Sequence, residues 1–329
     1  MDTETVQGGG MLTALWAGLG VAGRMMMMSP EDRRAFEALE LRIRAILPEE
    51  YQDSYEEVEP VSMGSADLKY ERHGKVAWND IWDTFCDLAM AGGPPHKGTL
   101  LTAALPGEID AEPERYRQVV AEICRGIEMV TGLEATLSPV PGWVRVECTS
   151  VTAGWLARAI VMENVSARCD GTMLDLPAGP RYRVEKEIKN VVTAMAKTGH
   201  YWLNHVGPSQ QLKIGNLFDK ITAESPLIQP PLSGVDRGHP LRDKLMAKIQ
   251  QATGLKPWDV ACYGWLGVIC PSVGSAIWMM RAMVASNVFA RREDTVLFVP
   301  VNPETDPAGD TVATVVARVH RFARARRIL

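Results

Sequence analysis

Two neighbouring side chains, His96 and Lys97, have the types that acid–base chemistry and anion binding need. They lie in the segment AGGPPHKGT, residues 91–99, whose glycines allow the backbone to approach a ligand closely. The spacing matches neither the P-loop pattern nor GxGxxG. A competing interpretation is structural: the segment ends a helix and continues as a rigid Pro-Pro turn. The residues of this segment that we interpret as candidate ligand contacts are Gly92, Gly93 and Thr99.

A third histidine, His200, lies in GHYWLNH near the predicted end of a long helix, and we group it with His96 and Lys97 as a candidate catalytic residue. His205 follows five positions later. Metal-binding pairs on one helical face prefer separations of three or four, so a separation of five predicts different faces. We therefore predict no metal site. The alternative for His200 is a favourable interaction with the helix C-terminus.

Two cysteines, Cys148 and Cys270, end equivalent predicted strands just before helices begin. A thiol at a helix N-terminus can have a lowered pKa and act as a nucleophile. Cysteine is also among the most frequently buried residue types, which favours a structural role. No Ser/His/Asp or Cys/His/Asp arrangement follows from spacing, so whether the protein is an enzyme stays undecided at this stage.

The predicted elements that position these residues occur twice in the sequence. GWVRVECTS, residues 142–150, has a counterpart in GWLGVICPS, residues 264–272. The match continues, with one inserted residue, through the following helix and hairpin, which predicts an internal duplication. The repeated side chains that we interpret as ligand contacts in a cleft between the copies are Trp143, Trp265, Arg158 and Arg281. The alternatives are a core role for the tryptophans and ion pairs or surface packing for the arginines.

Each copy predicts an α-β-α-β-β-α unit, because a helical pattern, an alternating strand, a second helix, a hairpin and a third helix follow one another. The predicted fold is α+β, with small, mainly antiparallel sheets that carry helices on one face. An N-terminal hairpin turns at His73-Gly74 and leads into an amphipathic helix, DIWDTFCDLAMAGG. The predicted divisions are an apolar arm (1–30), the hairpin-helix region (31–112), unit 1 (113–206), a linker with one short helix (207–240) and unit 2 (241–329).

Composition limits the class of protein. The chain has 329 residues, 46% of them hydrophobic, and a net charge of −5, which argues against general nucleic-acid binding. Six cysteines without a CxxC pair and without a secretory signal predict reduced thiols and a cytoplasmic location. The apolar segment 11–28 contains Arg24 and three glycines, so we interpret it as a docking arm and predict no membrane span.

Three hypotheses for function follow. The first is a small-molecule-binding or accessory protein that holds an anionic ligand or a partner in a cleft between the two copies. The second is an enzyme with an asymmetric site built from His96, Lys97 and His200. The third is a structural subunit of a larger complex or homo-oligomer, suggested by the apolar arm and the basic tail RFARARRIL. No pattern names a cofactor, so the cofactor is unknown.

Overall fold

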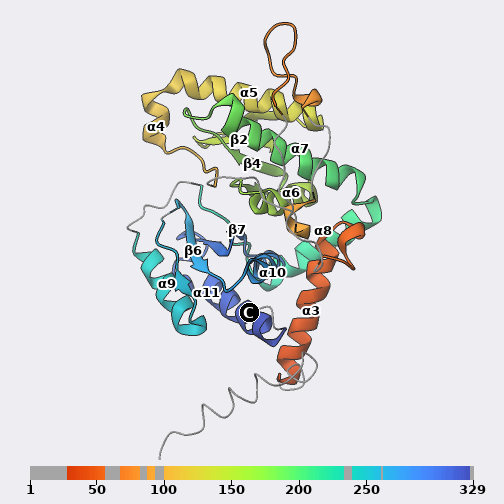
Figure 1. Cartoon of the computed structure of the whole chain (residues 1–329), viewed down its shortest axis with the longest axis vertical. Coiled ribbons are helices and arrows are strands. Elements are labelled where there is room, and N and C mark those ends of the chain that lie inside the picture. The colour runs from red at the N-terminus through yellow and green to blue at the C-terminus, as the bar shows by residue number, and fades with distance from the viewer. Residues whose placement is uncertain are drawn as a thin grey trace, which may run out of the picture.

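The computed structural model describes residues 28–55, 67–81, 87–92, 100–232, 239–260 and 262–326. These residues form a mixed α and β structure with two small antiparallel sheets of four strands each. We call residues 113–206 the first unit and residues 239–326 the second unit. Figure 1 shows the first unit above the second, with helices α6 and α10 near the middle and α3 along one side.

The first unit begins with α5 (Pro113–Thr131), which follows the short α4 (Pro106–Ala111). Its sheet has the order β1-β2-β4-β3, and the strands are β1 (Ala135–Leu137), β2 (Trp143–Glu147), β3 (Arg168–Asp170) and β4 (Met173–Pro177). Helix α6 (Ser150–Met162) connects β2 to β3 and packs beside β3 and β4. A π-helical turn, η4 (Val184–Ile188), leads into α7 (Lys189–Asn204), which packs between α5 and α6.

The second unit has the corresponding order of elements. Helix α9 (Pro240–Thr253) precedes a sheet of order β5-β6-β8-β7, formed by β5 (Lys256–Pro257), β6 (Trp265–Ile269), β7 (Arg291–Glu293) and β8 (Val296–Pro300). Helix α10 (Val273–Val284) connects β6 to β7, and α11 (Asp310–Ala325) packs against α9 and α10. Trp143 lies opposite Pro177 in the first sheet, and Trp265 lies opposite Pro300 in the second.

Local sequence explains how the elements end. Thr149 and Ser272 accept hydrogen bonds from backbone N–H groups in the first turns of α6 and α10, which caps both helices. Asn164 and Asn287 follow the same two helices with φ of 65° and 63°, a left-handed conformation that asparagine tolerates better than most residues. Both helices are buried on all sides from their second turn onward, so their sequences are apolar on nearly every side, with Arg158 and Arg281 as the charged exceptions.

Two predicted features of the units need correction. The predicted α-β-α-β-β-α order misses a strand, because each sheet has an additional edge strand, β1 or β5. These strands have only three and two residues, too few to show an alternating pattern, and pairing with β2 and β6 defines them. The predicted third helix of the first unit also differs from a regular helix, because its first turn is the π-helical η4.

The connecting regions differ more from prediction. The segment between the units contains α8 (Pro208–Glu224), a full helix of 17 residues where a short one was expected. In place of a continuous helix over DIWDTFCDLAMAGG, the described parts contain 3-10 turns, η2 (Trp78–Asp80) and η3 (Ala89–Ala91). The predicted turn at His73-Gly74 is present, closed by a single bridge between Tyr70 and Val76.

The N-terminal region also contains α3 (Pro30–Ile46) and the turn η1 (Glu49–Tyr51), which the sequence patterns did not predict. Helix α3 packs against α8 and α10, and Trp155 of α6 donates from Nε1 to the carbonyl of Ile46 at 2.8 Å. Most of the apolar arm lies outside the described residues. In the part of the chain that the structure covers, no helix has both the length and the apolar composition needed to cross a bilayer.

Candidate functional site

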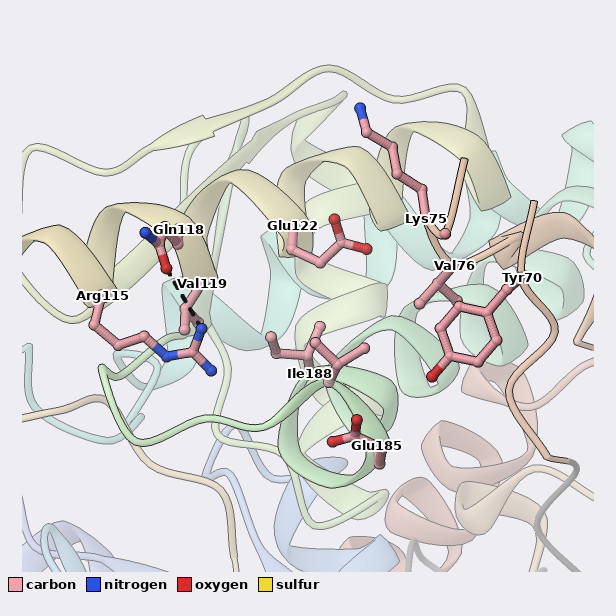
Figure 2. Close-up of a pocket in the computed structure, with 11 residues that line it drawn as sticks. Tyr70, Lys75, Val76, Arg115, Gln118, Val119, Glu122, Glu185 and Ile188 are labelled. Carbon is pink, nitrogen blue, oxygen red and sulfur yellow. Dashed lines mark hydrogen bonds between the residues drawn. The ribbon is translucent and has the colours of Figure 1, made fainter. Parts of the chain in front are cut away.

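A pocket of about 290 Å³ opens on the first unit, between α5, the turn at residues 70–76 and η4. We call it the α5 pocket. Figure 2 shows Arg115, Gln118 and Glu122 along α5, with Lys75, Val76 and Tyr70 at one end of the pocket and Glu185 and Ile188 across from α5. Its floor is apolar and includes Val119 and Ile188, which are buried. An apolar floor with a few polar groups at the rim is the usual composition of small-molecule sites.

The secondary structure explains how the walls are placed. Arg115, Gln118 and Glu122 recur at separations of three and four, so α5 presents them along one face. Gly74 has φ of 76°, which lets the chain reverse sharply and place Lys75 and Val76 beside α5. The π-helical η4 contains one wider turn, a feature that often occurs at functional sites, and it contributes Val184, Glu185 and Ile188.

The charges of the α5 pocket are not balanced locally. Glu122 is neutralised by Arg125, whose Nη2 lies 2.6 Å from its carboxylate, and it also accepts from Trp78 Nε1 at 2.9 Å. The hydrogen bonds that Arg125 donates to Glu122 raise the pKa of Arg125. Among the described residues, Arg115 and Lys75 form no ion pair, and Arg115 makes only long contacts of 3.4–3.5 Å to neutral groups. Because Glu122 is already paired, the described pocket lining has two cations, Arg115 and Lys75, and only one other carboxylate, the exposed Glu185.

A second group of polar residues lies on the face of α7 that is turned toward η1 and η3. Lys197 and Glu163 form an ion pair of 2.8 Å in which both side chains are almost completely buried. Further along α7, Tyr201 and Tyr51 hydroxyl oxygens lie 2.9 Å apart, and Tyr51 donates to Asp87 at 3.2 Å. Burial is the main reason that the pKa values of both tyrosines are raised, so both are neutral hydroxyls.

His200 and His205 lie at the exposed end of this face. Their Nε2 atoms are 3.2 Å apart, and His205 Nδ1 lies 2.9 Å from Glu50. The prediction that the two imidazoles lie on different faces is therefore wrong. The two rings meet at the C-terminus of α7, which ends at Asn204 and is followed by His205 with φ of −115°, so the ideal helical spacing is a poor guide there. Burial, and then the charge of His205, lower the pKa of His200.

The other predicted site residues are scattered or outside the described residues. Gly93, His96, Lys97 and Thr99 fall in undescribed residues 93–99, so their grouping with His200 stays a prediction. Gly92 ends η3 with φ of 116°.

The four predicted ligand contacts in the repeated segments are all buried. Arg158 bonds to Gly154 and Asn287, and Arg281 bonds to the carbonyl of Met90. Trp143 donates to the carbonyl of Leu232 at 2.9 Å, and Trp265 is 1% exposed. Their use as ligand contacts therefore stays a prediction, and the structure gives each arginine a protein partner instead.

The structure does not support a lowered pKa for Cys148 or Cys270, which a nucleophilic thiol would need. Burial raises the pKa of Cys148 to about 11 and that of Cys270 to about 12, so both remain thiols at neutral pH. The α5 pocket itself was missed at the level of sequence. The polar series Arg115, Gln118 and Glu122 was visible in the sequence. The pocket also needs residues 70–76, which lie some forty positions earlier in the chain.

Comparisons of the chain with protein-family models, with curated proteins and with solved structures find no match.

Proposed function

We propose that this protein binds a small anionic molecule, and that the α5 pocket holds it. The observation that carries the proposal is the pair of cations, Arg115 and Lys75, which form no ion pair among the described residues and stand over an apolar floor. An anionic group at the rim gains charge-assisted hydrogen bonds from Arg115 at one end of the pocket or from Lys75 near the other end, and an apolar body covers Val119 and Ile188. The sequence also predicted a small anionic ligand, but in a cleft between the two copies. The site proposed here is the α5 pocket.

We also propose that the two units arose by internal duplication. The support is the shared order of elements and the matched strand registers around Trp143 and Trp265. Leu101 and Ile228 form parallel bridges to Val165 and Val288, one after each left-handed asparagine. The α5 pocket breaks this symmetry, because the turn at residues 70–76, which belongs to neither unit, lines it together with α5 and η4 of the first unit. Under this proposal, the shared elements form the scaffold and the added turn forms the site.

An amphiphilic anion tests the proposal directly. The fluorescent probe 8-anilinonaphthalene-1-sulfonate combines a sulfonate with apolar rings, so we expect it to bind the native chain at one saturable site. Arg115→Gln and Lys75→Gln should each weaken binding by about tenfold to a hundredfold, since a hydrogen bond to a charged group contributes about 1.5–3 kcal/mol.

Arg117→Gln is the matched control, because Arg117 lies two residues further along α5, is exposed and pairs with Glu114. Equal affinities for Arg115→Gln, Arg117→Gln and the native chain would reject the α5 pocket as the anion site. Circular dichroism of each variant checks that the fold is retained.

A cytoplasmic location, a protein partner and homo-oligomer formation remain further proposals. They rest on the cysteine content, the basic tail and the apolar segment of the sequence. Native mass spectrometry of the purified chain would reveal both a retained anion and an assembly in one measurement.

A further inference from the structure

The paired imidazoles at the end of α7 form a hydrogen bond whose geometry also suits a shared metal ion. His200 and His205 direct their Nε2 atoms toward each other at 3.2 Å, with ring centroids 5.1 Å apart. Two nitrogens that are each about 2.0–2.1 Å from a tetrahedral ion lie about 3.3 Å apart. The pair therefore already has the separation that a shared metal ion imposes on two ligands.

Both rings also have a hydrogen-bond partner at Nδ1, the nitrogen that points away from the pair. His205 Nδ1 lies 2.9 Å from Glu50 Oε2, and His200 Nδ1 lies 3.0 Å from the Asn204 side-chain amide. An amide can present its oxygen in place of its nitrogen without a change of shape, and that oxygen accepts from an Nδ1–H group. Metal-binding histidines almost always donate the second ring N–H to a carboxylate or carbonyl. Both histidines of this pair have such a group in place.

The surroundings leave room for the rest of a coordination shell. The side chain of His205 is 31% exposed, so water can reach Nε2, while the Tyr201 ring shields one side at a centroid distance of 5.0 Å. Within the described residues, no set of three His, Cys, Asp or Glu side chains is arranged for a metal, so water must complete the shell.

We propose that His200 and His205 bind one divalent transition-metal ion through their Nε2 atoms, with Glu50 and Asn204 as orienting groups. The ion replaces the proton that the two nitrogens otherwise share. Imidazole ligands suit Zn²⁺, Ni²⁺ and Cu²⁺, whereas Mg²⁺ and Ca²⁺ prefer oxygen ligands. The site is separate from the α5 pocket and does not depend on the proposed function.

The test is calorimetric titration of the untagged full chain with ZnCl₂ and with NiCl₂. We expect one ion to bind per chain, and His200→Ala or His205→Ala to weaken binding at least about tenfold. Glu50→Gln should weaken it about tenfold, the usual effect of losing an orienting group. His73→Ala is the matched control, since His73 lies in an exposed turn, and it should bind like the native chain.

A second measurement separates binding at the pair from an effect on folding. In ¹H–¹⁵N spectra that detect imidazole nitrogens, Zn²⁺ should shift the Nε2 signals of His200 and His205 and leave those of His73 in place. The proposal is overturned if neither metal binds at one per chain, or if His205→Ala binds as tightly as the native chain. It is also overturned if saturating Zn²⁺ leaves both Nε2 signals unchanged.

Discussion

Arg158 of α6 donates from Nη2 to Oδ1 of Asn287, which follows α10 in the other unit, at 2.6 Å. In the reverse direction, Arg291 of β7 donates from Nε to Oδ1 of Asn164, which follows α6, at 2.9 Å. All four side chains are buried. The two left-handed helix ends therefore present their amide oxygens to the opposite unit, and each receives an arginine there.

The Arg158–Asn287 contact leads to a first prediction. Burial lowers the pKa of Arg158 to about 10, so the side chain is still charged at neutral pH and needs its acceptor. Asn287→Gly keeps the left-handed backbone but removes the acceptor, and we expect it to cost about 3 kcal/mol of stability. Asn287→Ala should cost about 1 kcal/mol more, because a Cβ disfavours this conformation. Urea unfolding of both variants measures the difference, and equal losses would refute the backbone contribution.

The buried ion pair of the first unit leads to a second prediction. Lys197→Met leaves the Glu163 carboxylate buried, with the backbone N–H of Ala89 still donating to Oε1 at 3.0 Å. Breaking a buried pair from one side costs about 3–5 kcal/mol. The double variant Glu163→Gln/Lys197→Met should recover most of this loss, because Gln keeps an acceptor for Ala89 and no charge remains. A double variant as unstable as Lys197→Met in urea unfolding would contradict this account.

Sequence patterns predicted much of the framework. The strands at Trp143 and Trp265 and the helices after them follow from alternation and periodicity. The edge strands β1 and β5 could not be predicted, since they exist only by pairing with a neighbour. Helix α3 was missed although Ser29 caps it and Pro30 begins it, both of which are recognisable signals.

The sites were harder to predict because they depend on distant contacts. The α5 pocket needs residues 70–76 to pack on α5, and no local pattern specifies that contact. The imidazole pair was judged from ideal helical spacing, which does not apply once the helix ends between His200 and His205. The sequence predicted Arg158 and Arg281 as a repeated pair of ligand contacts, but spacing alone could not show that Arg158 faces Asn287 while Arg281 faces Met90.

A third prediction concerns pH. His320 of α11 is 9% exposed, and its pKa is lowered first by burial and then by the charge of Arg324. Below its unfolded pKa of about 6.5, the unfolded chain binds a proton that the folded chain resists. The free energy of unfolding should therefore fall as the pH drops below about 6.5. We expect His320→Gln to reduce this slope between pH 7 and pH 5.5 in urea unfolding. A slope identical to that of the native chain would exclude His320 as a contributor.

The last prediction compares two glycines of the first sheet that both have positive φ. Gly142, with φ of 90°, precedes β2, and a Cβ there would lie 2.6 Å from the backbone oxygen of Ala104. Gly171, with φ of 56°, turns the β3–β4 hairpin, and a Cβ there would meet nothing within 4 Å. Both substitutions to alanine carry the cost of a left-handed residue, about 1 kcal/mol. Only Gly142→Ala adds a collision with backbone, which cannot move aside as a flexible side chain can.

We therefore expect Gly171→Ala to lose about 1 kcal/mol of stability and Gly142→Ala to lose about 3 kcal/mol or more. The larger loss has a local cause as well, because Gly142 donates to the Tyr116 hydroxyl at 2.9 Å and accepts from the N–H of Ala178 at 2.8 Å. A shift of Gly142 away from Ala104 weakens both bonds, and they join α5 and the end of β4 to the start of β2. Urea unfolding of the two variants side by side measures the difference. Equal losses would mean that the chain before α4 yields to the new methyl group, so that this close approach does not restrain the sheet.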